Sequence, residues 1–169
     1  MVKMINVFMG GTTSGFNWRS VLENAFSDKK YENKLRLFNP LVDDWNEEAQ
    51  ANEIRERENA DICLQVITPW IAGVYSIAEV VDDSNKKPEK TVFVILDKKT
   101  IINELEELQP RGWIYTMAYE GEIPDFPNAL KHSLDATRRL VESNGARVIL
   151  SLNDLVEYIE NQVNISMIL

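Results

Sequence analysis

The sequence predicts a doubly wound α/β fold in which helices cover both faces of a five-stranded parallel sheet. Two patterns in its 169 residues indicate this fold. Short apolar runs of strand length alternate with longer segments of helical periodicity, and polar or glycine-containing loops separate them. Such an alternation gives parallel strands joined by crossover helices, most simply in the flavodoxin-like (Rossmann-like) strand order. The length suits a single domain spanning residues 1–169.

In the first half of the chain, each apolar run ends in a turn signal. Gly10-Gly11 closes the first run, Asn39-Pro40 the second and Thr68-Pro69 the third. Asn17 and Asn46 precede helical segments and are predicted N-caps. We therefore expect strands over 5–9, 35–38 and 62–67, with helices over 18–27 and 47–59 between them.

The second half shows the same alternation with one interruption. Its predicted elements are a helix over 76–85, a strand over 91–96, a helix over 129–144 stopped by Gly145, a strand over 148–150 and a helix over 153–162. In the longer helix Leu130, Leu134, Thr137, Leu140 and Val141 share one face, and in the last helix Leu155, Tyr158 and Ile159 are expected to face inward.

Two segments of the second half fit no predicted element. Residues 109–127, with Trp113, Tyr115 and Tyr119, are predicted to be an insertion, and a packed surface excursion is favoured over a substrate lid. The apolar tail over 165–169 is expected to pack on the domain or on a second subunit.

Composition limits the classes of partner and compartment. Acidic side chains outnumber basic ones by 27 to 18, giving a net charge of -9, so we expect no nucleic-acid partner. No apolar run approaches the roughly 18 residues of a membrane span, and the N-terminal run is too short for a signal peptide. The single cysteine, Cys63, is predicted to be a buried structural thiol in a cytosolic protein.

The loop from Gly10 to Gly15 is a candidate binding site because it lies between a predicted strand and a predicted helix. Backbone N–H groups of Gly10, Gly11 and Thr12 could hold an anion or a sugar hydroxyl there. The loop lacks the Lys-Ser/Thr pair of a P-loop and the G-x-G-x-x-G spacing, so neither ATP nor a dinucleotide is indicated. A flexible turn without a ligand is an equally good interpretation of this loop alone.

The densest group of acids is Asp43-Asp44-Trp45-Asn46-Glu47-Glu48, after the second predicted strand. Asp43 and Asp44 beside Trp45 could orient sugar hydroxyls, or one of them could act as an acid with a raised pKa. For Glu47 and Glu48 the better interpretation is a helix start, where carboxylates favour the positive end of the helix dipole.

Glu79 has two interpretations. Ser76 lies three residues before it, and Ser-x-x-Glu at a helix start is the capping-box pattern, which the residues alone favour. A glutamate in the first turn after a strand end also lies where ligands bind, and the dipole would keep it ionised as a nucleophile. Asp82 and Asp83 follow one turn later, and their charges would raise the pKa of Glu79 if all three faced one way.

The residues give little support for a metal site or for a catalytic triad. His132 is the only histidine, so a zinc site or a Ser-His-Asp triad is disfavoured. The acids at 43, 44, 79, 82 and 83 could bind Mg²⁺ around a phosphate, but their spacing matches no established metal loop. We expect no metal and no organic cofactor.

An ordered set of motifs over residues 5–96 resembles the nucleoside 2-deoxyribosyltransferase-like family. They are Gly10-Gly11-Thr12 with Asn17-Trp18-Arg19, Phe38-Asn39-Pro40 with Val42 to Glu48, Ala60-Asp61, and Val66-Ile67-Thr68-Pro69 followed by Gly73 to Asn85. The resemblance implies a doubly wound fold and cleavage of the N-glycosidic bond of a 2'-deoxynucleoside. The sugar then passes through a glutamyl ester to another base or to water.

Residue by residue, the resemblance implies that Glu79 is the nucleophile. Asp43 and Asp44 would hold sugar hydroxyls or assist leaving-group protonation, Gly11 and Thr12 would line the sugar pocket, and Ser76 would support the turn that carries Glu79. The other motif residues expected to bind substrate are Gly10, Asn17, Trp18, Trp45, Pro69 and Gly73.

One position departs from the family. The better-known transferases carry a base-contacting aspartate six residues before the nucleophile, where this chain has Gly73. Nucleotide N-glycosidases, which hydrolyse 5'-monophosphates, are therefore an alternative. A non-catalytic nucleotide-binding sensor and a Mg²⁺-dependent phosphohydrolase are alternatives of other classes. The resemblance also implies a homo-oligomer, since the family often builds its site across subunits.

Overall fold

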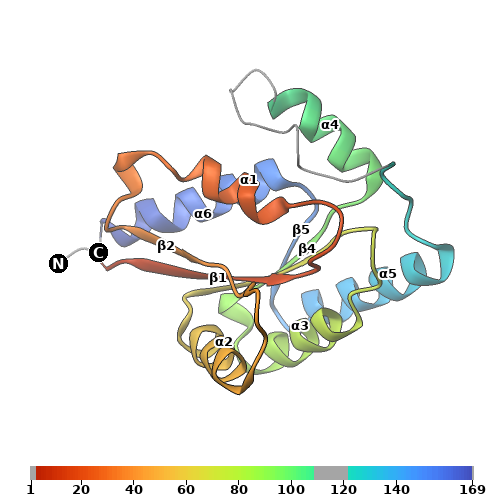
Figure 1. Cartoon of the computed structure of the whole chain (residues 1–169), viewed down its shortest axis with the longest axis horizontal. Coiled ribbons are helices and arrows are strands. Elements are labelled where there is room, and N and C mark those ends of the chain that lie inside the picture. The colour runs from red at the N-terminus through yellow and green to blue at the C-terminus, as the bar shows by residue number, and fades with distance from the viewer. Residues whose placement is uncertain (1–2, 109–121, 169) are drawn as a thin grey trace.

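The protein contains one five-stranded sheet in which every neighbouring pair of strands is parallel. The computed structural model describes residues 3–108 and 122–168. The strands are β1 (Ile5–Gly11), β2 (Leu35–Phe38), β3 (Ile62–Ile67), β4 (Thr91–Ile95) and β5 (Arg147–Ile149), in the order β2-β1-β3-β4-β5. The predicted doubly wound fold and flavodoxin-like order are confirmed (Figure 1).

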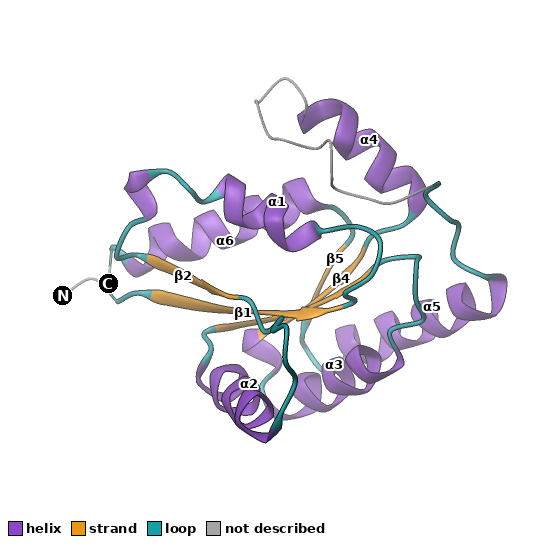
Figure 2. Cartoon of the chain, viewed as in Figure 1, coloured by secondary structure: helices purple, strands orange, loops and turns teal. Residues whose placement is uncertain are grey.

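Helices cover both faces of this sheet. Figure 2 shows α1 (Trp18–Ala25) and α6 (Leu152–Ser166) on one face, and α2 (Glu47–Asn59), α3 (Val74–Lys86) and α5 (Asn128–Ser143) on the other. The helix α4 (Lys98–Leu108) follows β4, and short 3-10 turns lie at Lys29–Tyr31 and Pro88–Lys90. Among the described residues, no helix is both long and apolar enough to span a membrane.

The core forms because β3 and β4 are buried on both faces. Alternate residues of a strand point to opposite faces, so Leu64 and Val66 join the cluster beneath α1 and α6. Ile67 packs in a second cluster with residues of α3 and α5, and Cys63 packs with Phe8 beneath α2. The Cys63 thiol is free and fully buried, as a structural cysteine should be.

Two predicted helix starts are confirmed in detail. The side chain of Asn17 accepts a hydrogen bond from the Ser20 N–H, and that of Asn46 accepts one from the Ala49 N–H. Both are N-caps that satisfy an otherwise unpaired backbone donor. The helix α2 and the strands β2 and β3 have the predicted bounds, and the other predicted elements differ by a few residues at their ends.

Three expectations for the second half need correction. The prediction assigned no element between 96 and 109, where the structure has the helix α4. Leu140 does not face inward with Leu134 and Val141, because it is 45% exposed on the flank of α5. Tail residues Ile165, Met167 and Ile168 are also exposed, so the tail does not pack fully on its own domain, and packing on a second subunit stays a prediction. Of the predicted insertion at 109–127, residues 109–121 lie outside the described residues.

A buried glutamate joins α4 to α6. Glu104 is 5% exposed, and its Oε1 accepts a hydrogen bond from the Asn153 N–H at 2.9 Å, while Oε2 has no partner among the described residues. Burial is the largest cause that raises the pKa of Glu104 to about 7, and the charges of Asp154 and Glu107 raise it further. The carboxyl group is therefore protonated at mildly acidic pH in the folded chain.

We expect this group to make the chain less stable as pH rises. Between about pH 4.5 and 7 only the folded state keeps the Glu104 proton, so the free energy of unfolding falls across that window. Glu104→Gln removes this dependence, and the stability of the variant relative to wild type should increase by about 3 kcal/mol from pH 4 to pH 8. Urea unfolding of both proteins at the two pH values measures it. Equal differences at both pH values would contradict the assignment.

Candidate active site

A pocket lies at the carboxyl ends of β1, β2 and β3. In the strand order β2-β1-β3, the strands that follow β1 in the chain lie on either side of it, so the strand order reverses at β1. Doubly wound folds bind ligands at such a reversal. The pocket has a volume of about 470 Å³. Its lining residues are Gly10, Gly11, Thr12 and Thr13 after β1, Pro40, Leu41, Val42 and Trp45 after β2, Ile71, Gly73, Val74, Tyr75, Ser76 and Glu79 after β3, and Arg19 and Glu53.

Glycines let the loops of this pocket approach each other closely. A Cβ at Gly10 would lie 2.7 Å from the Gln65 Nε2, and one at Gly73 would lie 2.9 Å from the Thr12 Cγ2. Gly11 has a φ of 129°, and a Cβ there would collide with the Val66 backbone. Any side chain at these positions would push the loops apart.

Gly11→Ala should therefore destabilise the fold more than Gly145→Ala. Both positions have a positive φ, which costs an alanine about 1 to 3 kcal/mol. Only Gly11 adds a backbone collision, since the nearest atom to a Cβ at Gly145 is the Pro88 Cβ at 3.8 Å. Thermal or urea unfolding of the two variants measures the difference in stability. Equal losses of stability would show that the backbone around Gly11 moves to accept the methyl group without added strain.

Hydrogen bonds of Thr12 tie the first loop to the end of β3. Its hydroxyl lies 2.8 Å from the Thr68 hydroxyl and accepts a hydrogen bond from the Thr68 N–H at 3.1 Å. The Thr12 carbonyl accepts hydrogen bonds from the Trp18 indole and from Arg19. Thr12 is only 2% exposed, so its side chain fixes the shape of the pocket floor.

Arg19 is a buried cation whose three nitrogens each donate to a backbone carbonyl. Its guanidinium donates to the Met9, Thr12 and Gly11 oxygens at 2.9, 3.0 and 3.1 Å and lies 4.3 Å from the Trp18 ring centroid. Burial lowers the pKa of Arg19 to about 10, and Glu23 and Glu53 oppose that shift. Arg19 is still charged at neutral pH, and its geometry holds the loop after β1.

Glu79 lies in the second turn of α3, not in the first. The helix begins at Val74, after Gly73 in a left-handed conformation, and no side chain caps it. Ser76 is inside the helix, so the predicted capping box is wrong. The physical reason is that Gly73 reaches a φ of 61° and is itself the N-cap, so the helix starts three residues earlier than the Ser-x-x-Glu pattern indicates. The first residues of α3, Val74 to Ser76, consequently border the pocket, and the first N–H groups of a helix have no intrahelical acceptor.

Both carboxylate oxygens of Glu79 have a donor. Arg57 Nη1 donates to Oε1 at 2.7 Å, and Gln65 Nε2 donates to Oε2 at 3.0 Å. Glu79 is 8% exposed, and burial is the largest cause that raises its pKa, while Arg57 lowers it and Glu53 raises it. The carboxylate is fixed between a helix and a strand and still borders the pocket.

Arg57 joins the acids of α3 to α2. Its Nε donates to Asp83 Oδ2 at 2.9 Å and its Nη2 to the Glu79 carbonyl at 3.2 Å. Asp83 also pairs with Lys87 at 3.4 Å, whereas Asp82 is exposed and pairs with Lys86. Only one of the two aspartates therefore acts on Glu79 as expected. Asp83 raises the pKa of Glu79, as a minor cause, whereas Asp82 is exposed to solvent.

A second acid, Glu53 of α2, lines the same pocket. It is partly buried, and burial is the largest cause that raises its pKa above the ordinary glutamate value, with Arg57 and Arg19 opposing. A raised pKa makes a carboxyl group a better candidate for a general acid than an ordinary glutamate. The pocket therefore contains two carboxyl groups in different environments.

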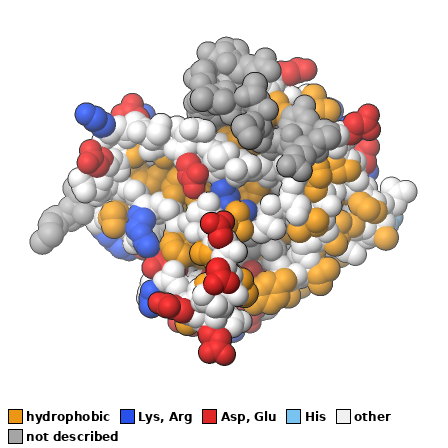
Figure 3. Space-filling view, in the orientation of Figure 1, with side chains coloured by type: hydrophobic (Ala, Val, Ile, Leu, Met, Phe, Trp, Pro, Cys, Tyr) orange, Lys and Arg blue, Asp and Glu red, His pale blue; other side chains and the backbone are white. Residues whose placement is uncertain are grey.

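The structure brings together seven of the predicted site residues in this pocket. They are Gly10, Gly11, Thr12, Trp45, Gly73, Ser76 and Glu79. Five others do not line it. Asp43 and Asp44 are exposed, although Val42 and Trp45 of the same loop do line the pocket. Asn17 is the N-cap of α1, and Trp18 and Pro69 are buried away from the pocket lining. Figure 3 shows acidic side chains gathered over α2 and the loop before it.

Sequence reasoning did not single out Glu53, Arg57 or Gln65. Glu53 and Arg57 belong to a highly charged helix in which no residue stands out by type. Gln65 does carry a signal, because it is the one polar residue of the buried strand Ile62–Ile67 and a buried amide requires a partner. That partner is Glu79.

Comparisons with known proteins identify no relative. Searches against family models, curated proteins and solved structures find no significant match to the chain. Within residues 3–108 and 122–168, no group of three or more His, Cys, Asp and Glu side chains is arranged to hold a metal ion.

Proposed function

We propose that this chain is a nucleoside 2-deoxyribosyltransferase-like enzyme that cleaves the N-glycosidic bond of a 2'-deoxynucleoside. The observation that carries the proposal is Glu79, a buried carboxylate oriented by Arg57 and Gln65 at the wall of a pocket at the strand-order reversal. Its position agrees with the nucleophile implied by the motif resemblance. A fixed carboxylate beside a sugar-sized pocket is the arrangement that retaining glycosyl transfer requires.

In the first step a Glu79 oxygen attacks C1' of the sugar. The new C–O bond forms as the C1'–N bond breaks, and the bonding electron pair leaves with the base nitrogen. Glu53 is placed to supply the proton that the departing base takes up, since it lines the same pocket and burial raises its pKa. This assigns to Glu53 the protonation role that the resemblance gave to Asp43 or Asp44.

In the second step an acceptor attacks C1' from the side that the first base left. A second base, or water, forms the new bond, the ester C–O bond breaks, and Glu79 regains its carboxylate. The acceptor loses a proton, which returns to Glu53. Arg57 and Gln65 stabilise the carboxylate that is regenerated, through the same hydrogen bonds that orient it.

The charges around the pocket favour a nucleoside over a 5'-monophosphate. Arg19 is the only cationic side chain among the pocket-lining residues that the structure describes, and its guanidinium donates hydrogen bonds to three backbone carbonyls. The acids Asp43, Asp44, Glu47 and Glu48 lie nearby on the loop and the first turn of α2. A phosphate would therefore meet repulsion without a free cation to oppose it.

A chromatographic assay tests the proposal. Purified chain is incubated with the four 2'-deoxynucleosides or their 5'-monophosphates, with and without a second free base, and both free base and new nucleoside are measured. Base exchange supports a transferase, and release without exchange supports an N-glycosidase, with the preferred substrate form deciding between nucleoside and nucleotide. Tight binding without turnover would instead indicate a sensor, and activity lost to a chelator would indicate a metal-dependent enzyme. The cytosolic location and homo-oligomeric state stay predictions.

A further inference from the structure

We infer that Asp83 is a positioning residue for Glu79 and acts through the guanidinium of Arg57. The inference rests on the proposed function, because Glu79 is the proposed nucleophile. Asp83 does not line the pocket, so a role in the reaction has to pass through another side chain.

The guanidinium of Arg57 is held at three nitrogens. Its Nη1 and Nη2 donate to the carboxylate and the carbonyl of Glu79, and its Nε donates to the Asp83 Oδ2 at 2.9 Å. The group is planar and its donors have fixed directions, so a hydrogen bond at Nε restricts where the other two nitrogens point. Asp83 therefore sets the orientation in which Arg57 meets Glu79.

Asp83 can act as an anchor because it is itself fixed. Its side chain is 4% exposed and lies one turn after Glu79 on the same face of α3. Its Oδ1 lies 3.4 Å from the Lys87 Nζ, and Lys87 donates to the Arg57 carbonyl at 3.0 Å. The Cys63 thiol donates to the same carbonyl. Both the side chain and the backbone of Arg57 are thus tied to the last turns of α3.

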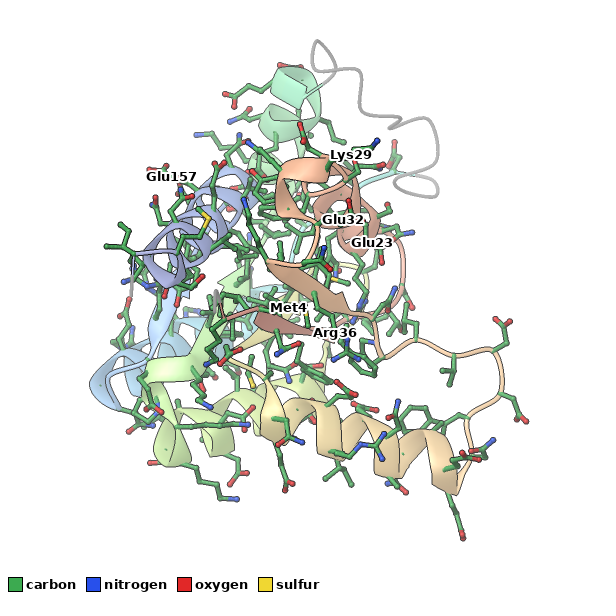
Figure 4. The ribbon with its side chains drawn as sticks, turned by 90° about the vertical axis from the view of Figure 1, so that its left-hand side faces the viewer. Met4, Glu23, Lys29, Glu32, Arg36 and Glu157 are labelled. Carbon is green, nitrogen blue, oxygen red and sulfur yellow. The ribbon has the colours of Figure 1, made fainter. Side chains whose placement is uncertain are left out.

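The helix that carries Arg57 has no apolar anchor of its own. All of α2 lies within the described residues, and none of its residues is buried. Figure 4 shows the loop between β2 and α2 extending away from the sheet, and residues 41–46 of that loop are exposed. We therefore expect the position of Arg57 to depend on its polar contacts with Asp83 and Lys87 more than on apolar packing of α2.

The same arrangement divides the charge of Arg57 between two carboxylates. Burial is the largest cause that raises the pKa of Glu79, Arg57 lowers that pKa, and Glu53 and Asp83 raise it. Nucleophilicity falls as the pKa of a group falls, as thiols show. Because Asp83 shares the cation, Glu79 is oriented by Arg57 and still keeps more of its basicity than an unshared ion pair would leave.

Titration of Glu79 by NMR tests the inference without turnover. The full chain is isotope-labelled at its glutamate carboxyl carbons, and the signal of Glu79 is the one that Glu79→Gln removes. Asp83→Asn keeps an acceptor for Arg57 but removes the negative charge, so we expect the pKa of Glu79 to fall by about 1 pH unit. Asp82→Asn makes the same change at the neighbouring exposed acid, which pairs with Lys86, and should leave that pKa unchanged. A pKa of Glu79 that is unchanged or higher in Asp83→Asn overturns the inference.

Kinetics separate positioning from a purely structural tie between α2 and α3. Asp83→Ala removes the acceptor of the Arg57 Nε, so kcat for base release should fall by about 10- to 100-fold, the cost of misplacing a reacting group by about 1 Å. KM should stay within about threefold, because Asp83 does not line the pocket. Asp83→Asn, which keeps an acceptor, should recover most of the lost kcat.

A structural tie alone would lower the stability of Asp83→Ala but leave kcat of the folded protein unchanged. Urea unfolding shows which fraction of each variant is folded. An unchanged kcat in folded Asp83→Ala overturns the inference, and if this variant does not fold, the titration of Asp83→Asn decides.

The inference and the proposed function can fail separately. Base release or exchange by the wild-type chain tests the proposed function alone. If that activity is present while Asp83→Asn leaves the pKa of Glu79 unchanged, only the role of Asp83 is wrong. If no deoxynucleoside is cleaved, the proposed function fails, and the titration alone decides whether Asp83 acts on Glu79.

Discussion

Glu79→Gln is expected to lower base release and base exchange by at least about 10³-fold, because an amide cannot form the sugar ester. The fold should persist. The new amide can still accept from Arg57, and the Gln65 Oε1, which is buried without a hydrogen-bond partner among the described residues, becomes an acceptor for the new N–H after an amide flip. The measurement is the chromatographic assay, with circular dichroism and urea unfolding to establish that the variant is folded.

A matched change elsewhere serves as the control. Glu89→Gln makes the same chemical change at an exposed residue of the turn Pro88–Lys90 and should keep wild-type activity. If the folded Glu79 variant also kept wild-type activity, the covalent mechanism would be excluded, although the pocket could still bind a nucleoside. Glutamine is preferred to alanine here, because alanine would leave the Arg57 Nη1 and the Gln65 Nε2 without the acceptor that Glu79 provides.

The architecture was predictable because its signals are local and repeated. Each apolar run carries its own turn residues, and Asn17 and Asn46 mark their helix starts by a side-chain type that few positions favour. The start of α3 was not predictable in the same way. Ser76 and Glu79 match a capping box by type, but the left-handed conformation of Gly73 overrides that pattern, and only the folded backbone reveals it.

The site was predictable only where its residues follow strand ends. Gly10, Gly11, Trp45 and Glu79 lie there, and parallel strands bring those ends together. Glu53 and Arg57 come to the pocket from the middle and end of a helix, through the packing of α2 beside α3, which no local pattern encodes. Asp43 and Asp44 show the converse. They have the right type and the right loop, but they are exposed and do not line the pocket.

The same geometry links stability to the site. Arg57 is the cation that lies between two carboxylates of α3, and the side chains of Arg57, Glu79 and Asp83 are 17%, 9% and 4% exposed. Asp83 has Lys87 as a second cation, but for Glu79 Arg57 provides the only ion pair that the structure describes. A buried carboxylate that loses its cation retains its desolvation penalty, so Arg57 both orients Glu79 and favours its ionised form.

Arg57→Gln is therefore expected to lower the free energy of unfolding at pH 7 by about 3 kcal/mol or more. The loss should shrink as pH falls. Without the cation, burial raises the pKa of Glu79 further above its unfolded value, and protonation at low pH relieves the uncompensated charge. The double variant Arg57→Gln/Glu79→Gln should recover part of the free energy of unfolding that Arg57→Gln loses at pH 7. The reason is that position 79 then carries no buried charge without a partner.

Arg36→Gln supplies the comparison that isolates burial as the cause. Arg36 pairs with Glu56 of α2 at 2.6 Å, a similar distance to the Arg57 pair, but its side chain is 42% exposed. Exposed pairs contribute about 1 kcal/mol or less, so this variant should lose little stability and show little pH dependence. Urea unfolding at pH 5 and pH 7 measures all four proteins. If Arg36→Gln and Arg57→Gln lost the same amount at both pH values, the ion pair would not be what holds Glu79 in place, and its orientation would have to come from Gln65 and the start of α3 alone.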